Sequence, residues 1–154
     1  MKGNAQLLQT LNGLLANELA AISQYMVHEE VVENWNYEKL GKMIRVRAIQ
    51  EMKHAETLIG RILFLEGMPI VSQLSPIHIG SDVPKQFEND LASEMIAVRD
   101  YNAAIKLAVE VGDNATKEIL ESILKEEDGH VDQIEGQQDQ IKQMGLPTYL
   151  TNQV

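Results

Sequence analysis

The sequence contains no cysteine, which excludes disulfides, thiolate metal sites and Cys-x-x-Cys redox modules. It has only four prolines, and its 44% of hydrophobic residues is typical of a chain that folds. No apolar run approaches the roughly eighteen residues that a membrane-spanning helix needs. Asn4 and Gln6 interrupt the N-terminus before an apolar core of signal-peptide length can form. At 154 residues we therefore expect one cytoplasmic domain, residues 1–154, with no membrane partner.

Basic residues are also scarce. The 13 Lys and Arg residues face 23 Asp and Glu residues, which gives a formal net charge of −10. This balance argues against nucleic acid as a partner, because nucleic-acid-binding domains present a basic surface. An acidic chain suits a protein that attracts cations, although the same charge would serve solubility alone.

Turn-forming residues are confined to three stretches, at 34–36, 67–84 and 112–114. The segments between them are rich in Leu, Ile, Ala, Glu, Lys and Gln, and their apolar residues recur every three or four positions, which is the pattern of a helix bundle. The expected helices span about 5–34, 37–66, 84–111 and 115–144, with a short fifth helix after 145–147.

The connection lengths predict the topology. Two to four residues join the first helix to the second and the third to the fourth, so each pair should form an antiparallel hairpin. The link over 67–83 can reach roughly 55 Å when extended, whereas a thirty-residue helix is about 45 Å long. This link can therefore run the length of the bundle. We expect an all-α four-helix bundle with a long crossover between the second and third helices and a short C-terminal helix.

One spacing occurs twice in the chain: a glutamate and, thirty-three residues later, a Glu-x-x-His. The two copies lie 76 residues apart, at Glu18, Glu51 and His54 and at Glu94, Glu127 and His130. Each of these residues fills a gap in an apolar stripe, and residues three apart on a helix point within about 60° of each other. All six should therefore point into the bundle, where unpaired carboxylates are costly. Four carboxylates and two imidazoles suit a pair of first-row metal ions such as iron or manganese, and a buried polar network without metal is the alternative.

Five segments of the chain resemble bacterioferritins, the haem-containing branch of the ferritin family. They are LNGLLANELAAISQY at 11–25, QEMKHAE at 50–56, RILFLEGMP at 61–69, EEDGH at 126–130 and MGLPTYL at 144–150. The resemblance covers nearly the whole chain and implies a ferritin-like fold. It also implies that the six repeat residues are the ligands of a di-iron ferroxidase centre, with Glu51 and Glu127 bridging the two ions.

The same resemblance implies a shell of twenty-four subunits built from dimers. Such shells oxidise Fe(II) with dioxygen or peroxide, store the ferric mineral, and need an electron donor for iron release. Whether a second subunit type joins this chain in the shell stays open.

The resemblance implies a role for two further residues. Tyr25 lies two turns after Glu18 on the same face, and the family implies an auxiliary redox tyrosine there; a core tyrosine with a satisfied hydroxyl is an equal alternative. Met52 lies about 100° from Glu51 and faces outward with Ile49, Ile59 and Leu63. In bacterioferritins the matching methionine, one from each of two subunits, is the axial ligand of a shared b-type haem, although a methionine there could also simply pack.

Some positions depart from the family pattern. Arg45, Val46 and Arg47 stand where members usually have aromatic, His and Glu residues. We expect Arg47 to pair with a carboxylate of the site and Arg45 to meet a haem propionate or an acid of an interface. Val46 and Gln50 lack the metal-binding side chains that some members carry on the inner surface of the shell. His28, near the end of the first helix, is expected at the surface.

Two rival interpretations remain open. A non-haem ferritin or another di-iron oxidase would keep the fold and drop the haem. A structural helical protein would have no redox chemistry.

Overall fold

The computed structural model describes all residues, 1–154, as five helices without a strand. The helices are α1 (Ala5–Asn34), α2 (Glu38–Phe64), α3 (Val83–Glu110), α4 (Asn114–Met144) and α5 (Leu146–Thr151). Their bounds agree with the expected ranges to within two residues, and the predicted all-α class is confirmed. None of these helices combines the length and apolar character needed to cross a membrane.

Short polar side chains begin three of the long helices. Asn4 accepts a hydrogen bond from the backbone N–H of Leu7 at the start of α1. Asp82 caps α3 in the same way, and Asp113 caps α4. These oxygens satisfy backbone N–H groups that have no partner within the helix, which fixes where each helix begins.

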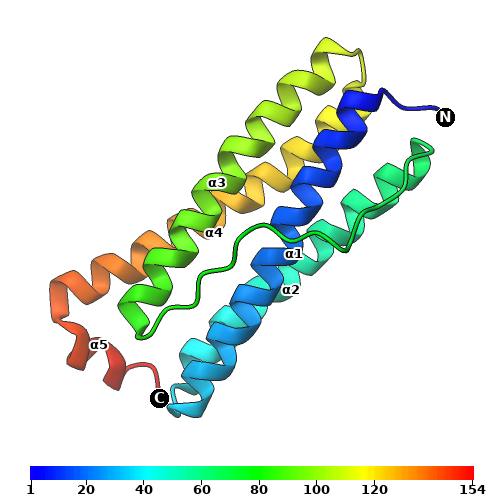
Figure 1. Cartoon of the computed structure of the whole chain (residues 1–154). Helices are drawn as coiled ribbons and strands as arrows, with labels where there is room; N and C mark the ends of the chain where they lie inside the picture. Colours follow the sequence, from blue (N-terminus) through cyan, green and yellow to red (C-terminus); the bar gives the residue numbers. More distant parts are fainter.

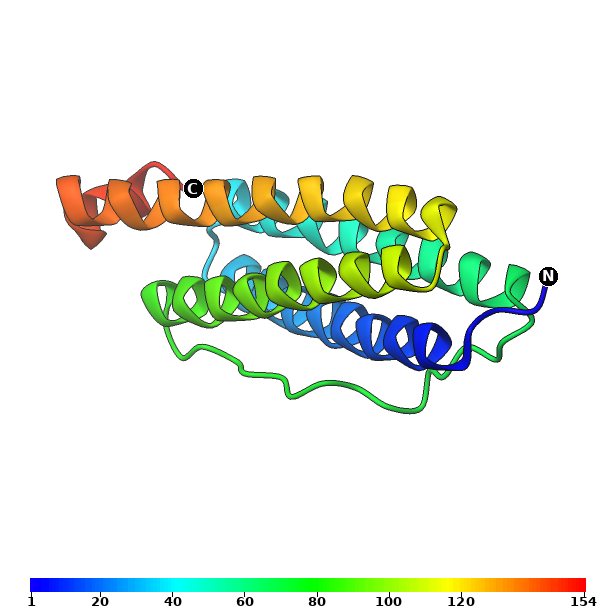
Figure 2. The same cartoon turned by 90° about the horizontal axis from the view of Figure 1, so that it is seen from above.

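The helices form two antiparallel hairpins, α1 with α2 and α3 with α4, joined by the crossover over residues 65–82 (Figure 1; Figure 2). The crossover is extended and follows α1. Four of its backbone N–H groups donate to α1 in the same order along both segments: Ile70 to Asn12, Ser75 to the carbonyl of Ala16, His78 to Gln24 and Gly80 to His28. The crossover therefore runs the length of the bundle, as its length predicted, so that α2 and α3 run parallel.

The crossover buries His28 completely, so the prediction that His28 lies at the surface is wrong. Its Nε2 accepts the N–H of Gly80 at 3.0 Å, so its Nδ1 carries the proton and donates to Asp90 Oδ1 at 2.9 Å. The periodicity of α1 could not reveal this cover, because it comes from a segment more than fifty residues later in the chain.

The apolar core is divided into two clusters along the bundle. One is built from the first half of α1, the end of α2, the second half of α3 and the start of α4, and includes Leu11 and Leu58. The other joins the second half of α1, the start of α2, the start of α3 and the second half of α4, and includes Ile44 and Ile134. Fully burying one such side chain contributes about 1.5–3 kcal/mol, so these clusters hold the bundle together on both sides of a polar middle.

The short helix α5 closes the second cluster. Tyr149 is fully buried and meets the Phe87 ring edge-on, with ring centroids 6.4 Å apart. Its hydroxyl donates to Gln137 Oε1 at 2.7 Å, which satisfies the one polar group that burial would otherwise leave unpaired.

Candidate metal centre

The six ionisable residues of the repeat converge between the two apolar clusters, each at most 5% exposed. Their ligand atoms form two overlapping groups, in each of which all atoms lie within 4.8 Å of one another. The groups are Glu18, Glu51, His54 and Glu127, and Glu51, Glu94, Glu127 and His130. The structure thus brings together all six predicted residues, and the two groups share the carboxylates of Glu51 and Glu127.

Several atoms of this cluster are buried without a hydrogen-bond partner. They include Glu94 Oε2, and also Glu51 Oε1 and His130 Nδ1, which lie 3.0 Å apart without a hydrogen bond between them. Leaving such atoms unpaired costs about 1–3 kcal/mol each and more when they are charged. A divalent cation within each group would satisfy them at once, so the donor set fits a pair of metal ions.

Protons and metal ions compete for these carboxylates. Burial raises the pKa of Glu51 well above its ordinary value and that of Glu127 to about 12. Burial alone would also raise the pKa of Glu94, but its close contacts with Glu127 and His130 hold it at about 2. The cluster therefore shares protons among its carboxylates, and metal binding would displace them.

Each histidine points one ring nitrogen into the cluster and the other away from it. His54 Nδ1 lies 2.7 Å from Glu127 and its Nε2 lies 2.9 Å from Glu126 Oε2. His130 Nδ1 lies 3.0 Å from Glu51, and its Nε2 lies 2.8 Å from Gln50 Oε1. An acceptor at Nε2 holds the proton there and leaves the Nδ1 lone pair free for a metal ion.

Sequence reasoning missed both outer acceptors, although a signal for them was present. Gln50 and Glu126 each precede the Glu of a Glu-x-x-His and are 76 residues apart, the offset of the repeat itself. Each accepts from the histidine of the opposite hairpin.

Two tyrosines extend the same repeat. Tyr25 on α1 donates its hydroxyl hydrogen bond to Glu94, and Tyr101 on α3 donates to Glu18 Oε1 at 2.5 Å. Each tyrosine lies seven residues after the glutamate of its own helix and bonds the glutamate of the other. Only Tyr25 was singled out from the sequence, but Tyr101 lies 76 residues after it and the repeat could have found it.

Arg47 does not pair with a carboxylate of the site, so that prediction is wrong. Its guanidinium carbon lies 5.1 Å from the centroid of the Tyr25 ring, and its Nη2 donates to Gln133 at 2.7 Å. Its Nε and Nη1 are buried without a partner. Side chains on a helix lean toward its N-terminus, so Arg47 reaches away from Glu51, which lies one turn later.

The structure also shows the contacts or exposure of other α2 residues near Arg47. Arg45 pairs with Glu29 of the same chain at 3.1 Å, whereas the sequence predicted a haem propionate or an interface acid. Val46 is exposed, and Met52 is 44% exposed on an outward face with Ile49 and Leu63, as its position relative to Glu51 predicted. Ile59 is instead partly buried against the first apolar cluster.

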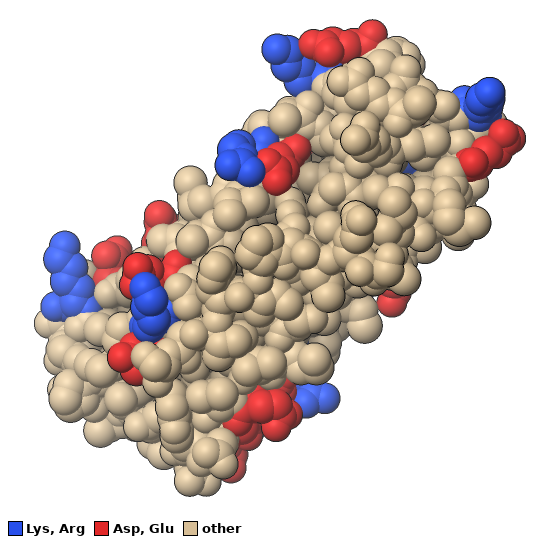
Figure 3. Space-filling view, viewed as in Figure 1, with Lys and Arg blue, Asp and Glu red and all other residues tan.

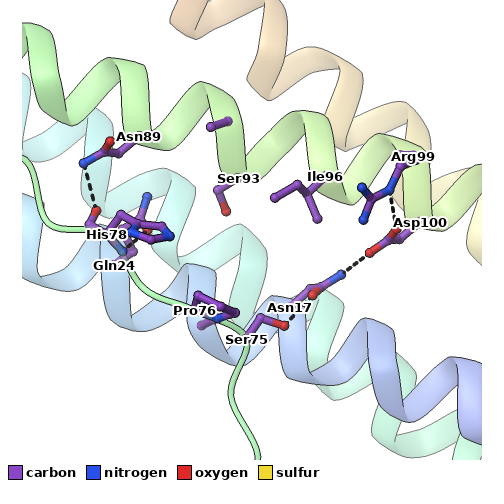
Figure 4. Close-up of a pocket in the computed structure, with 12 residues that line it drawn as sticks. Asn17, Gln24, Ser75, Pro76, His78, Asn89, Ser93, Ile96, Arg99 and Asp100 are labelled. Carbon is purple, nitrogen blue, oxygen red and sulfur yellow. Dashed lines mark hydrogen bonds and ion pairs between the residues drawn. The ribbon is translucent and has the colours of Figure 1, made fainter.

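A separate pocket of about 380 Å³ lies between α1, α3 and the crossover (Figure 4). Asn17 bridges its floor, donating to Asp100 at 2.9 Å and accepting from Ser75 at 2.5 Å. The pocket holds no cluster of metal-ligating side chains, since both such groups of the chain lie at the centre of the bundle. Metal chemistry is therefore expected at the centre, away from this pocket.

Comparison with known proteins agrees with this arrangement. The model of the ferritin-like domain matches residues 8–144. The chain is 45% identical to the bacterioferritin of Rhodobacter capsulatus over 137 residues, which covers 89% of this chain and 85% of that protein. It is 36% identical to the bacterioferritin of Brucella melitensis and 35% identical to that of Mycobacterium avium, each over 149 residues and 97% of this chain, with 92% and 94% of those proteins covered. With the ferritin-like bundle and matches across nearly its full length, the chain belongs to the bacterioferritins of the ferritin family.

Proposed function

We propose that this protein stores iron and oxidises Fe(II) at a pair of metal positions in the middle of its bundle. Its family membership supports iron storage. The observation that carries the ferroxidase proposal is the sharing of Glu51 and Glu127 between two buried groups of ligand atoms. Shared carboxylates can hold two cations next to each other, and two adjacent Fe(II) ions supply two electrons to one molecule of oxidant.

The residues divide the work between them. Glu51 and Glu127 would bridge the two Fe(II) ions. Glu18 and His54 would complete one position, and Glu94 and His130 would complete the other. Four carboxylates balance the four positive charges of two Fe(II) ions, so the loaded site is neutral and can stay buried.

The surrounding protein prepares the site for this chemistry. Glu126 and Gln50 orient the two imidazoles through their outer nitrogens. The apolar clusters on either side limit access of water, and the hydroxyls of Tyr25 and Tyr101 hold the two unshared glutamates in place.

We further propose that the chain assembles with copies of itself as a shell of twenty-four subunits built from dimers. The view in Figure 3 supports an interface, because charged side chains lie toward the ends and edges while the middle is largely free of them. Apolar side chains of the crossover, including Val71, Leu74 and Ile79, are exposed. An exposed apolar surface of this kind marks an interaction site.

In that assembly Met52 would ligate a b-type haem together with Met52 of a second copy. Its position on an outward apolar face of α2 supports this role. Haem-loaded wild-type protein should show an intense Soret band, and Met52→Leu, which keeps an apolar side chain, should lose it. An unchanged band in the variant would remove Met52 from the haem site. Failure of the wild type to bind haem would favour a non-haem ferritin of the same fold.

Stopped-flow absorbance after mixing with Fe(II) and dioxygen tests the ferroxidase proposal. The protein should oxidise two Fe(II) per subunit in a fast phase, and Glu18→Ala or His130→Ala should nearly abolish it. Glu118→Ala is the matched control, because it removes an exposed carboxylate from α4 that makes no ion pair. An equal fast phase in all of these proteins would rule out the central site as the place of oxidation. Absence of a fast phase in the wild type would leave a helical protein without redox chemistry.

A further inference from the structure

Two buried tyrosines stand in equivalent positions beside the metal centre. Tyr25 bonds Glu94 and Tyr101 bonds Glu18, so each phenol is one hydrogen bond away from a candidate ligand. The chain has no cysteine, and its one tryptophan, Trp35, follows the end of α1 in the turn before α2. These two tyrosines are therefore the oxidisable side chains in direct hydrogen-bond contact with the cluster.

Complete reduction of dioxygen needs more electrons than the two metal positions supply. One dioxygen molecule takes four electrons on its way to two waters, and two Fe(II) ions supply only two. A buried phenol bonded to a carboxylate can supply one more electron, because its proton has an acceptor at hand. The question is which of the two phenols is easier to oxidise.

The surroundings of Tyr25 oppose the loss of an electron. The guanidinium of Arg47 lies over its ring, is 1% exposed and has no carboxylate partner to offset its charge. A cation over an aromatic face favours the electron-rich phenol over the electron-poor radical. Asp90 acts in the opposite sense, but His28 and Gln24 both donate to its Oδ1.

The surroundings of Tyr101 favour the loss of an electron. No Lys or Arg lies over its ring, and the charges that act on it are mainly the carboxylates of Glu18, Glu127 and Glu51. Its hydroxyl lies 2.5 Å from Glu18 Oε1, which can receive the proton as the electron leaves. The two tyrosines therefore differ chiefly in the cation that covers one of them.

We propose that Tyr101, rather than Tyr25, is the residue that supplies an electron during dioxygen reduction, and that Arg47 directs this choice. The inference rests on the proposed ferroxidase function. Tyr101 gives one electron to the oxidant and passes its proton along the hydrogen bond toward Glu18, leaving a neutral tyrosyl radical. With a third Fe(II) from solution, one dioxygen, three Fe(II), one tyrosine and three protons give two waters, three Fe(III) and the radical.

Freeze-quench electron paramagnetic resonance tests this choice directly. Protein mixed with three Fe(II) per subunit and dioxygen should give a tyrosyl radical in the wild type and in Tyr25→Phe. The signal should fall about tenfold in Tyr101→Phe, the size of preference that one buried cation–π contact can create. A radical that survives Tyr101→Phe and disappears in Tyr25→Phe would overturn the proposal.

Absorbance of Fe(III) in the same samples separates this inference from the function on which it rests. If iron is oxidised at the normal rate and the wild type forms no radical, the role of Tyr101 is refuted and the ferroxidase proposal stands. If no iron is oxidised, both fail together.

Arg47→Gln tests the directing role. This change removes the charge and keeps an amide that can bond Gln133. In a Tyr101→Phe background it should restore the radical, now on Tyr25, by about fivefold or more. Arg45→Gln is the control, since it removes a neighbouring exposed charge that covers no ring. Zn(II) binding at two ions per subunit checks that each variant keeps its site. An Arg47→Gln signal no stronger than that of Arg45→Gln would refute the directing role.

Discussion

The hairpin of α1 and α2 and the hairpin of α3 and α4 offer the same ligand types at positions 76 residues apart, yet their surroundings differ. Glu126 places a carboxylate on the outer nitrogen of His54, whereas Gln50 places a neutral amide on that of His130. Arg47 covers Tyr25, and no cation covers Tyr101. The comparison teaches that two metal positions with matched ligands can be made unequal by residues one contact further out.

The largest expected effect comes from removing a carboxylate that both metal positions share. Glu127→Ala removes a ligand from both positions, whereas His130→Ala removes one from a single position. Cobalt(II) titration followed by absorbance should show two tight sites in the wild type, one in His130→Ala and none in Glu127→Ala. The loss of metal affinity should exceed about 100-fold, because changing a residue that only contacts a ligand already costs up to that much. Equal stoichiometry in the two variants would contradict the shared carboxylate.

Deprotonation of the same carboxylates should weaken the packing of the two hairpins against each other. Because the pKa of Glu127 is raised from 4.5 to about 12, its stabilising effect is complete below pH 4.5 and is lost as pH rises toward about 12. Glu51 acts in the same sense, and Glu94, with a pKa of about 2, loses its contribution only in strong acid. Chelator-treated protein should therefore unfold at lower temperature at pH 9 than at pH 5.

Calorimetry measures this trend, with each kcal/mol shifting the midpoint by about 2–4 °C in a chain of this size. Addition of Zn(II) should flatten the pH dependence, because the metal replaces the protons. Glu127→Gln, which cannot ionise, is the matched variant and should show a weaker trend. A chelated wild type that becomes more stable at high pH would contradict the account.

The smallest effect should come from exchanging the outer acceptors. Glu126→Gln should weaken the first metal position about tenfold, and Gln50→Glu should strengthen the second by a similar factor. A carboxylate accepts the Nε2 proton more strongly than an amide does and so makes the imidazole a better ligand. Isothermal titration with Zn(II) should resolve two unequal sites in the wild type and nearly equal ones in either variant. Two equal sites in the wild type would show that the outer acceptors do not matter.

The sequence predicted the features that are set within a single helix, namely its bounds and which side chains point inward. The expected helices match α1 to α4 closely because apolar periodicity and turn residues are local signals. The same periodicity placed all six ionisable residues of the repeat inside the bundle. The haem role of Met52 stays a prediction, although its outward position agrees with the helical geometry.

What the sequence did not reveal depends on contacts between distant segments. His28 is buried by the crossover, and Arg47 finds Tyr25 and Gln133 on other helices instead of a carboxylate. Tyr101 and Glu126 act across the hairpins, and only a search of the repeat at every position would have found them.

Anomalous diffraction from crystals soaked anaerobically in Fe(II) tests the central claim most directly. The account predicts two peaks about 3.5–4 Å apart, both in contact with Glu51 and Glu127. One should lie beside His54 Nδ1 and the other beside His130 Nδ1. Peaks confined to the outer surface, with none between the four helices, would contradict it.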